Sequence, residues 1–204
     1  MLRNYFTIAA RTLWTHRGHT VINGVGLALG LAACMLLALY VQQEVSYDEF
    51  HEKADRIYQV VTTMSRSGSV DRLASTPVPS GPEMRASFPQ VERLVRLDEQ
   101  TGVAKVGDTS WETDVLFAGA GFFEMFSFPL RRGRAKTALD DPNSVVLTTE
   151  KARTYFGSTN VVGRRLSLQL NGTFYEFTVA GVARPAPNTS SIPLGVVVPF
   201  TRLT

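Results

Sequence analysis

The strongest pattern along the chain is an uninterrupted apolar segment near the amino terminus. Residues 20–41 read TVINGVGLALGLAACMLLALYV and carry no charged side chain. A helix rises 1.5 Å per residue, so about 20 apolar residues cross the roughly 30 Å hydrocarbon core of a bilayer. The pattern predicts a transmembrane helix from Thr20 to Val41, within a membrane segment of residues 19–45.

The charges on the two sides of this segment differ in sign. The preceding residues include basic side chains and histidines but no acid, namely Arg3, Arg11, His16, Arg17 and His19. The following residues are mainly acidic, with Glu44, Asp48, Glu49, Glu52 and Asp55 against Lys53 and Arg56. By the positive-inside rule, the amino terminus is predicted to be cytoplasmic and everything after Val41 is predicted to be exported.

Two other interpretations of the segment remain open but are disfavoured. A cleaved signal peptide has an apolar core of about 7–15 residues followed by a small-residue cleavage site. Here the apolar run is longer, and the residues that follow it are Gln42, Gln43, Glu44 and Val45. A buried helix of a soluble protein does not explain the charge asymmetry. We therefore expect a retained membrane anchor.

The residues before the membrane segment form an amphipathic pattern. Leu2, Phe6, Ala9 and Leu13 recur near one helical face, while the arginines occupy other faces. Residues 1–18 are therefore predicted to be a cytoplasmic leader lying in the membrane interface. The alternative is the solvated start of one continuous helix.

Small residues inside the membrane segment predict helix packing. Gly26 and Gly30 form a Gly-x-x-x-Gly pair, with Gly24 close by. Such residues let helix backbones approach closely, although glycine is also common in membrane helices in general. We expect this helix to pack against a partner helix.

A connector, residues 46–55, joins the membrane segment to the rest of the chain. Ser46-Tyr-Asp-Glu49 has the spacing of a capping box, which predicts a short helix from Ser46 to about Asp55. We expect Ser46, Asp48, Phe50 and Asp55 to carry this connection to the periplasmic domain.

The remaining residues, 46–204, alternate between strand and helix patterns. Predicted strands cover residues 57–64, 70–74, 91–98, 103–106, 111–117, 145–149, 164–170, 174–182 and 195–200. Short helices are predicted at 82–87, at the Phe-rich stretch around 122–128, and at 150–156 before Gly157. The fold class is therefore α+β: one transmembrane helix followed by a mixed α/β domain, which could divide into two lobes.

Composition disfavours several functions. The net charge of +3 is too small to indicate nucleic-acid binding, and the cluster of Arg131, Arg132 and Arg134 fits a solvated turn better than an anion site.

The single cysteine, Cys34, falls in the membrane segment, so no disulfide is expected. No metal or cofactor site is predicted. With no phosphate loop, no Gly-x-Ser-x-Gly elbow and only His51 as an exported general base, we do not expect an enzyme.

Several blocks of sequence, taken in order, resemble one family. The segments on which the resemblance rests are LRNYFTIAARTL, the glycine-rich span, YDEFHEKADRIYQV, FPQVERLVRL, FFEMFSFPLRRG, ALDDPNSVVLTTEKARTYFG, VVGRRLSL and FTVAGVARPAPNTS. Together they cover essentially the whole chain. The sequence resembles the amino-terminal part of FtsX/MacB-like ABC transporter permeases, that is, the first membrane helix and the MacB-like periplasmic core domain.

The resemblance implies a role in mechanical transmission across the bacterial cytoplasmic (inner) membrane, with the residues after about 45 in the periplasm. It implies a permease dimer in the lipid bilayer and a separate cytoplasmic ABC ATPase, engaged through parts of the permease beyond Thr204. Because the family's later membrane helices do not follow, we expect a carboxyl-terminally incomplete domain or a fragment. A membrane-anchored module that binds or senses a ligand or protein outside the cytoplasm is the alternative. The transported substrate cannot be inferred.

Overall fold

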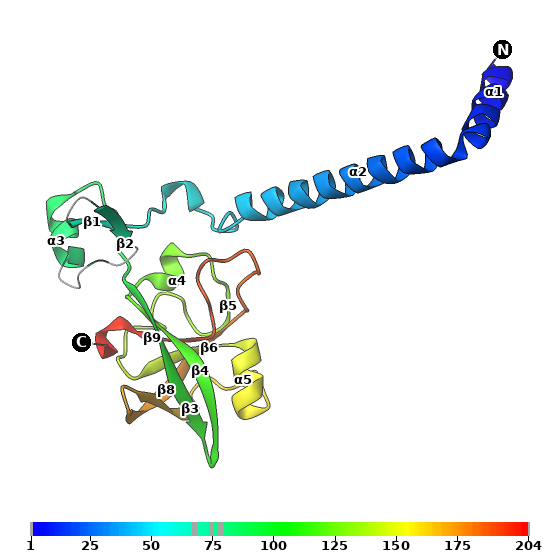
Figure 1. The fold of residues 1–204 in the computed structure, drawn as a ribbon. Coiled ribbons are helices and arrows are strands. Elements are labelled where there is room, and N and C mark those ends of the chain that lie inside the picture. The colour runs from blue at the N-terminus through cyan, green and yellow to red at the C-terminus, as the bar shows by residue number, and fades with distance from the viewer. Residues whose placement is uncertain (1, 67–68, 74–75, 77–79, 204) are drawn as a thin grey trace. The chain divides into compact units, whose positions relative to one another are not determined.

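The first unit of the structure consists of two helices. The computed structural model describes residues 2–66, 69–73, 76 and 80–203, and the chain divides into two compact units, residues 1–47 and 48–204. In the first unit, α1 (Leu2–Thr15) and α2 (Arg17–Val45) follow one another (Figure 1). His16, with φ −106° and ψ 36°, interrupts the helical geometry between them. The leader is thus a helix distinct from α2, and its place in the membrane interface stays a prediction.

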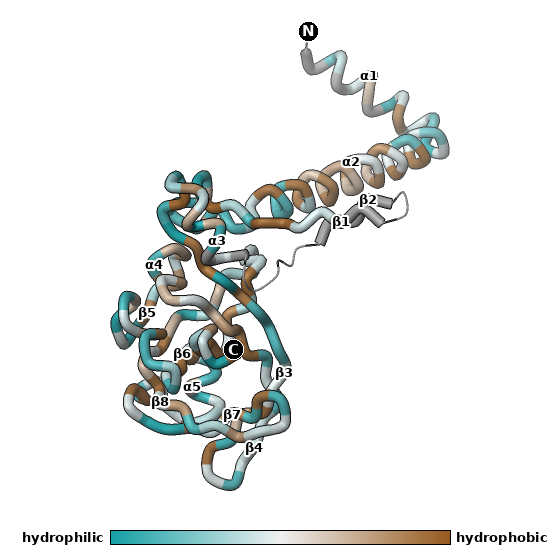
Figure 2. Tube along the Cα trace, turned by 90° about the vertical axis from the view of Figure 1, so that its left-hand side faces the viewer, coloured by the Kyte–Doolittle hydropathy of each residue, from teal (hydrophilic) through white to brown (hydrophobic). Residues whose placement is uncertain are grey.

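The helix α2 contains the whole apolar segment. It is 29 residues long, and of the described helices it is the one long and apolar enough to cross a bilayer. None of its described side chains is buried, and apolar residues dominate its length (Figure 2). A methyl group built on Gly24, Gly26 or Gly30 would meet no described atom within 4 Å. The surface that the glycines offer for packing is therefore free in this chain.

The helix predicted to begin at Ser46 is absent, and the capping-box prediction is wrong. Ser46 instead ends α2: its backbone N–H donates to Gln42 O and Gln43 O at 3.2 Å, and its hydroxyl donates to Gln43 O at 2.8 Å. Because these groups already complete the previous helix, they cannot begin a new one. Beyond Ser46 the connector runs through turns to a single 3-10 turn, η1 (Ala54–Arg56).

The second unit is a mixed domain of short helices and strands. In chain order the elements are β1 (Thr62–Arg66), β2 (Ser69–Leu73), α3 (Ser80–Ser87), β3 (Leu97–Val106), β4 (Thr109–Ala118), α4 (Phe122–Met125), β5 (Leu130–Arg132), β6 (Ser144–Thr148), α5 (Thr149–Phe156), β7 (Arg165–Leu170), β8 (Thr173–Ala183), β9 (Val196–Pro199) and the 3-10 turn η2 (Phe200–Arg202). This is the predicted α+β class.

The larger sheet closes on itself. Its strand order is β5-β8-β6-β9-β4-β3-β7, and β7 also pairs with β8. The first half of β8 pairs with β7, and its second half pairs with β5 and β6. The strands β8, β6, β9, β4, β3 and β7 therefore form a closed ring, which leaves few open strand edges. The strands β1 and β2 form a separate antiparallel hairpin.

Two apolar cores lie on opposite faces of the central strands. Along β4, Val115 and Phe117 belong to one core, while Leu116 and Ala118 belong to the other. The first core receives side chains from all six strands of the ring and so fills its interior. The second receives Phe122 and other aromatic residues of the predicted cluster. Burial on both faces explains why β6 and β9 are continuous apolar runs rather than alternating ones.

Most predicted elements are confirmed, and the errors besides the absent helix at Ser46 concern strand boundaries. The strand at 145–149, the helix after it and the left-handed Gly157 are present, Gly157 with φ 68°. Residues 57–61 and 91–96 lack regular structure, because no strand among the described residues pairs with them. The predicted strand at 103–106 is the end of the longer β3. The turn residues 67–68 and the Pro-rich residues 77–79 lie outside the described residues.

Candidate functional site

The best-organised polar site in the second unit is where the connector joins the domain. We call this site the docking cluster; it consists of Asp48, His51 and Glu52 from the connector, with Ser127, Thr189 and Ser191. Ser127 follows α4, and the other two residues lie in the loop between β8 and β9. Within the described residues, no group of three or more His, Cys, Asp or Glu side chains could hold a metal ion.

Asp48 anchors the connector to the loop before β9. Its backbone N–H donates to Thr189 O at 2.8 Å. Its carboxylate accepts from Ser191 N at 2.9 Å through Oδ1, and from the Ser191 hydroxyl through Oδ2. Asp48 has φ 59°, a left-handed conformation that Asp and Asn tolerate better than most residues. Both the side chain and the backbone of Asp48 thus fix one sharp bend of the chain.

His51 anchors the connector to the segment after α4. Its side chain is 3% exposed, and its Nδ1 accepts a hydrogen bond from Ser127 N at 3.1 Å. The rings of Phe50, Phe126 and Phe128 surround it, with centroids 4.0, 5.2 and 5.2 Å away. Burial lowers the pKa of His51, and the nearby Asp48 carboxylate opposes that shift only in part. The imidazole is therefore a neutral acceptor in this site.

A third contact links the connector to Ser127. The backbone N–H of Glu52 donates to Ser127 Oγ at 2.9 Å. Ser127 thus donates to His51 through its amide and accepts from Glu52 through its hydroxyl. A typical hydrogen bond contributes about 0.5–1.5 kcal/mol net, and one to a charged group such as the Asp48 carboxylate contributes about 1.5–3 kcal/mol. Together these bonds attach residues 48–52 of the connector to two separate loops of the domain.

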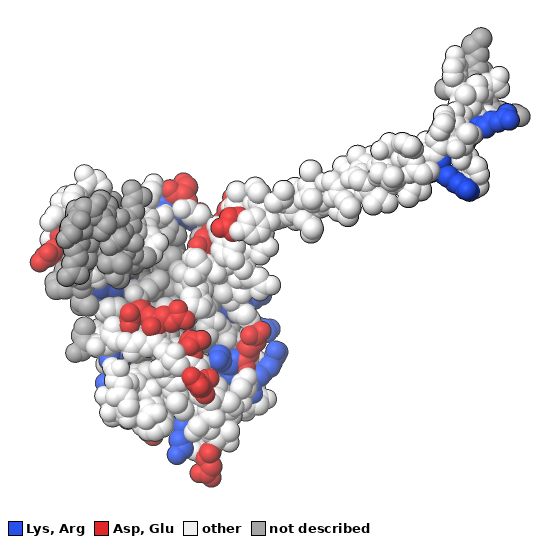
Figure 3. Space-filling model, in the orientation of Figure 1, with Lys and Arg blue, Asp and Glu red and all other residues white. Residues whose placement is uncertain are grey.

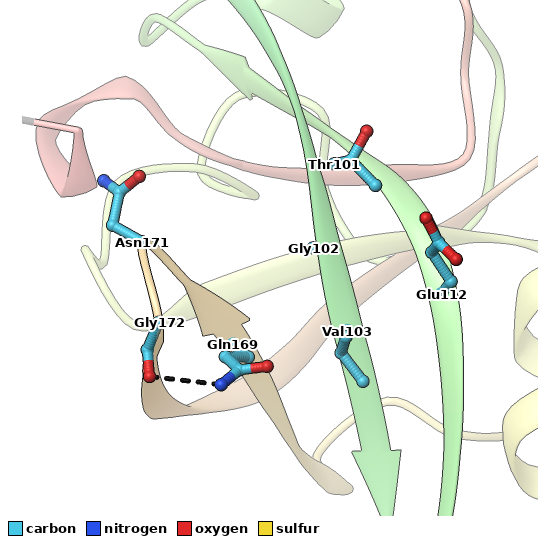
Figure 4. Close-up of a pocket in the computed structure, with 7 residues that line it drawn as sticks. All are labelled: Thr101, Gly102, Val103, Glu112, Gln169, Asn171 and Gly172. Atoms are coloured by element: carbon cyan, nitrogen blue, oxygen red, sulfur yellow. Dashed lines mark hydrogen bonds between the residues drawn. The ribbon is translucent and has the colours of Figure 1, made fainter.

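A shallow hollow beside β3 is the second candidate site (Figure 4). Its volume is about 310 Å³, and its walls include Thr101, Glu112, Gln169 and Asn171. Pockets for small molecules are mostly apolar and enclose most of the ligand. This hollow is open, its lining mixes polar and apolar surface, and the Gln169 side-chain amide donates to Gly172 O at 3.1 Å (Figure 4). It lacks the enclosure that specific capture of a small molecule requires.

The predicted connector residues have different environments. Asp48 belongs to the docking cluster, and Phe50 is half-buried against the His51 ring. Asp55 is exposed, and its backbone carbonyl accepts from the Tyr58 hydroxyl at 3.3 Å. Ser46 belongs to the end of α2. The arginines 131, 132 and 134 lie exposed in and after β5, in agreement with a solvated turn.

Sequence reasoning missed His51, Ser127 and Ser191 as parts of this site. It treated His51 only as an available general base, whereas the structure buries it and uses its Nδ1 for a backbone amide. Ser127 and Ser191 lie 76 and 143 residues away from their partners in the chain. Local patterns carry no signal for contacts of that separation.

The comparisons with known proteins agree with this architecture. Residues 20–204 match the family model of the MacB-like periplasmic core domain. No curated protein sequence gives a significant match. Among solved structures, a domain of a permease protein from Porphyromonas gingivalis is 24% identical with a TM-score of 0.54, covering 65% of this chain and 56% of that one.

Two further solved structures are similar at lower scores. The periplasmic region of MacB from Actinobacillus actinomycetemcomitans is 19% identical with a TM-score of 0.47, covering 61% of this chain and 56% of that one. The extracellular domain of the ABC-type transporter YknZ from Gram-positive bacteria is 17% identical with a TM-score of 0.44, covering 55% and 57%. The chain thus spans little more than half of each structure. Since the family model matches nearly its full length, the chain belongs to the family of MacB-like periplasmic core domains.

Proposed function

We propose that this chain is the first membrane helix and periplasmic domain of a permease subunit in an ABC-type export or mechanotransmission system, powered by a separate ATPase. Membership of the family supports the transporter context. The apolar helix α2 supports a membrane anchor. In this proposal α2 lies in the inner membrane, the leader α1 on its cytoplasmic side, and residues after about 45 in the periplasm.

The charge distribution supports this orientation. Charged side chains occur at both ends of α2, and the surface between them is free of charge (Figure 3). Basic residues precede the apolar segment and acidic residues follow it. Loops rich in Lys and Arg remain on the cytoplasmic side of bacterial membranes.

The observation that carries the mechanical part of the proposal is the docking cluster. The helix ends at Val45, so only Ser46 and Tyr47 separate it from Asp48. Asp48 and His51 then bind two loops that border the second core. In this proposal, a displacement of the helix end reaches the domain through this short chain segment, whose residues from Asp48 onward are hydrogen-bonded to the domain. A flexible tether would not need such an attachment.

The partner proteins are part of the same proposal. We propose a dimer of permease subunits in which the Gly26 and Gly30 face of α2 packs against another membrane helix. The free surface at these glycines supports this. The ATPase would bind regions of the permease outside this chain, and the substrate stays unassigned.

Purification of the native assembly tests the proposal. The protein is tagged at its chromosomal locus, extracted from membranes in mild detergent and isolated with its bound partners. We expect an ATPase with a phosphate-binding loop to copurify and to hydrolyse ATP in the complex. A protein purified without any ATPase, at native expression and in several detergents, would favour the anchored binding module instead.

A further inference from the structure

His51 is a buried titratable side chain, and a purely mechanical attachment of the connector would not require a titratable group at this position. An apolar side chain would fill the same space between Phe50, Phe126 and Phe128. The imidazole instead uses one nitrogen as an acceptor, and its other nitrogen, Nε2, makes no hydrogen bond within the described residues. Nε2 lies 4.0 Å from Asp48 Oδ1, beyond hydrogen-bond distance.

Few charges face the imidazole. From its own segment the charged neighbour is Asp48, whose carboxylate is already engaged by Ser191. The segment after α4 presents Phe126, Ser127 and Phe128, which are uncharged. On α4 itself, Glu124 is paired with Arg93 at 2.7 Å. The loop before β9 reaches Asp48 with Thr189 and Ser191, also uncharged.

Protonation of His51 conflicts with this arrangement. In the neutral ring, Nδ1 carries the lone pair that accepts the Ser127 N–H. The second proton of an imidazolium goes to Nδ1 and faces that N–H, so two donors point at one another. The new charge also lies in an aromatic enclosure with little solvent, where an unpaired charge is costly. The attraction to Asp48 across 4.0 Å compensates for only part of this cost.

We propose that His51 makes the attachment of the connector acid-sensitive, so that protonation of its imidazole breaks the Ser127 hydrogen bond and releases the connector from the domain. The proposal concerns the docking cluster alone and does not depend on which system the protein serves. If the protein is a permease subunit, acidification of the periplasm would weaken the coupling between the helix and the domain.

The direction of the pH effect follows from proton linkage. Burial lowers the pKa of docked His51 below the ordinary value of about 6.5, to which the released side chain returns. The released form therefore binds the proton more readily. Docking is fully stable above about pH 6.5, and each pH unit below that favours release by up to about tenfold, until the docked pKa is reached.

Hydrogen exchange of named amides tests the proposal in the full chain, reconstituted in nanodiscs. The amides of Glu52, Ser127 and Ser191 donate the hydrogen bonds of the docking cluster. Between pH 7.5 and 5, after correction for intrinsic exchange, we expect the protection of these amides to fall once the pH drops below about 6.5. Core amides such as those of Val146 and Val197 should keep their protection and show that the domain stays folded.

Two variants isolate His51. In His51→Asn the side-chain oxygen can still accept from Ser127 N–H but does not titrate, so we expect protection independent of pH. The matched control replaces the exposed His16 and His19 with Asn and should retain the pH dependence of the wild type. Equal pH dependence in His51→Asn and wild type would overturn the proposal.

A measurement on the wild type alone covers the case in which His51→Asn does not fold. The imidazole resonances of the labelled chain give the titration midpoint of His51. We expect this midpoint to lie below the ordinary imidazole value of about 6.5, and to coincide with the loss of protection at Ser127. A ring that titrates while Ser127 stays protected, or a protection that stays constant down to pH 5, would contradict the inference.

Discussion

Asp48 shows how much of the site depends on a single side chain. It combines a left-handed backbone, with φ 59°, and a carboxylate that accepts twice from Ser191. The sequence names Asp48 among the residues expected to connect the membrane segment to the domain, but it does not indicate what Asp48 binds. Its role comes from a loop 143 residues further on, and no local pattern predicts that contact.

Replacing Asp48 with alanine should loosen the connector without unfolding the domain. The change removes both acceptors of Ser191, and since the carboxylate is 35% exposed, the loss should be roughly 1–3 kcal/mol in docking free energy. Hydrogen exchange of the Ser191 amide measures this loss of docking free energy. Asp48→Asn keeps one acceptor and the tolerance for positive φ, so its loss should be smaller. The exposed Asp55→Ala is the control, and an effect there equal to that of Asp48→Ala would contradict the assignment.

Gly133 provides a test of the fold at the same scale. It has φ 91°, and a methyl group there would come 2.5 Å from Ala180 O. Gly133→Ala should therefore cost more than the roughly 1–2 kcal/mol of left-handed strain alone. Gly163, with φ 84° and open space around it, is the matched control, and Gly163→Ala should show only the strain.

Denaturant unfolding measures both glycine variants. Trp111 reports on the domain by fluorescence once Trp14 is replaced with phenylalanine. We expect a lower midpoint for Gly133→Ala than for Gly163→Ala. The reverse order would show that the turn after β5 is packed differently.

At the scale of elements, most of the strands and helices could be predicted because local rules dominate there. The strand β6 is followed directly by the helix α5, and α5 ends at the left-handed Gly157, as the sequence predicts. Residues 57–61 show that local composition alone does not determine a strand. Their composition favours a strand, but a strand requires a partner, and none pairs with them in the part of the chain that the structure describes. The capping-box error at Ser46 has the same origin, since the end of α2 already occupies that residue.

The helix α2 carries a prediction about association. Gly26→Leu together with Gly30→Leu should weaken crosslinking between α2 and a neighbouring helix in membranes, because bulky side chains keep the backbones apart. Gly24 lies on nearly the opposite face, two residues along a helix of 3.6 residues per turn. Gly24→Leu is therefore the matched control. Crosslinking that is unchanged in the double variant, or lost equally in the control, would contradict the assigned face.

At the scale of the whole molecule, the sequence predicts the class but not the topology. The pairing of β8 with both β6 and β7 closes the ring, and β4 pairs in parallel with β9, about 80 residues later. Such pairings depend on how the whole chain packs. The continuous apolar runs of β6 and β9 indicate only that both faces of these strands are buried.

We propose that nucleotide turnover in an ATPase moves this domain through the connector. The most direct test compares amide exchange in the purified native complex with and without ATP, in the presence of vanadate to trap the nucleotide-bound state. We predict that protection changes at Asp48, Glu52 and Ser191 in the wild type, and that Asp48→Ala abolishes the change in the loop before β9 while ATP hydrolysis persists. A connector whose protection is the same in both nucleotide states would contradict the claim.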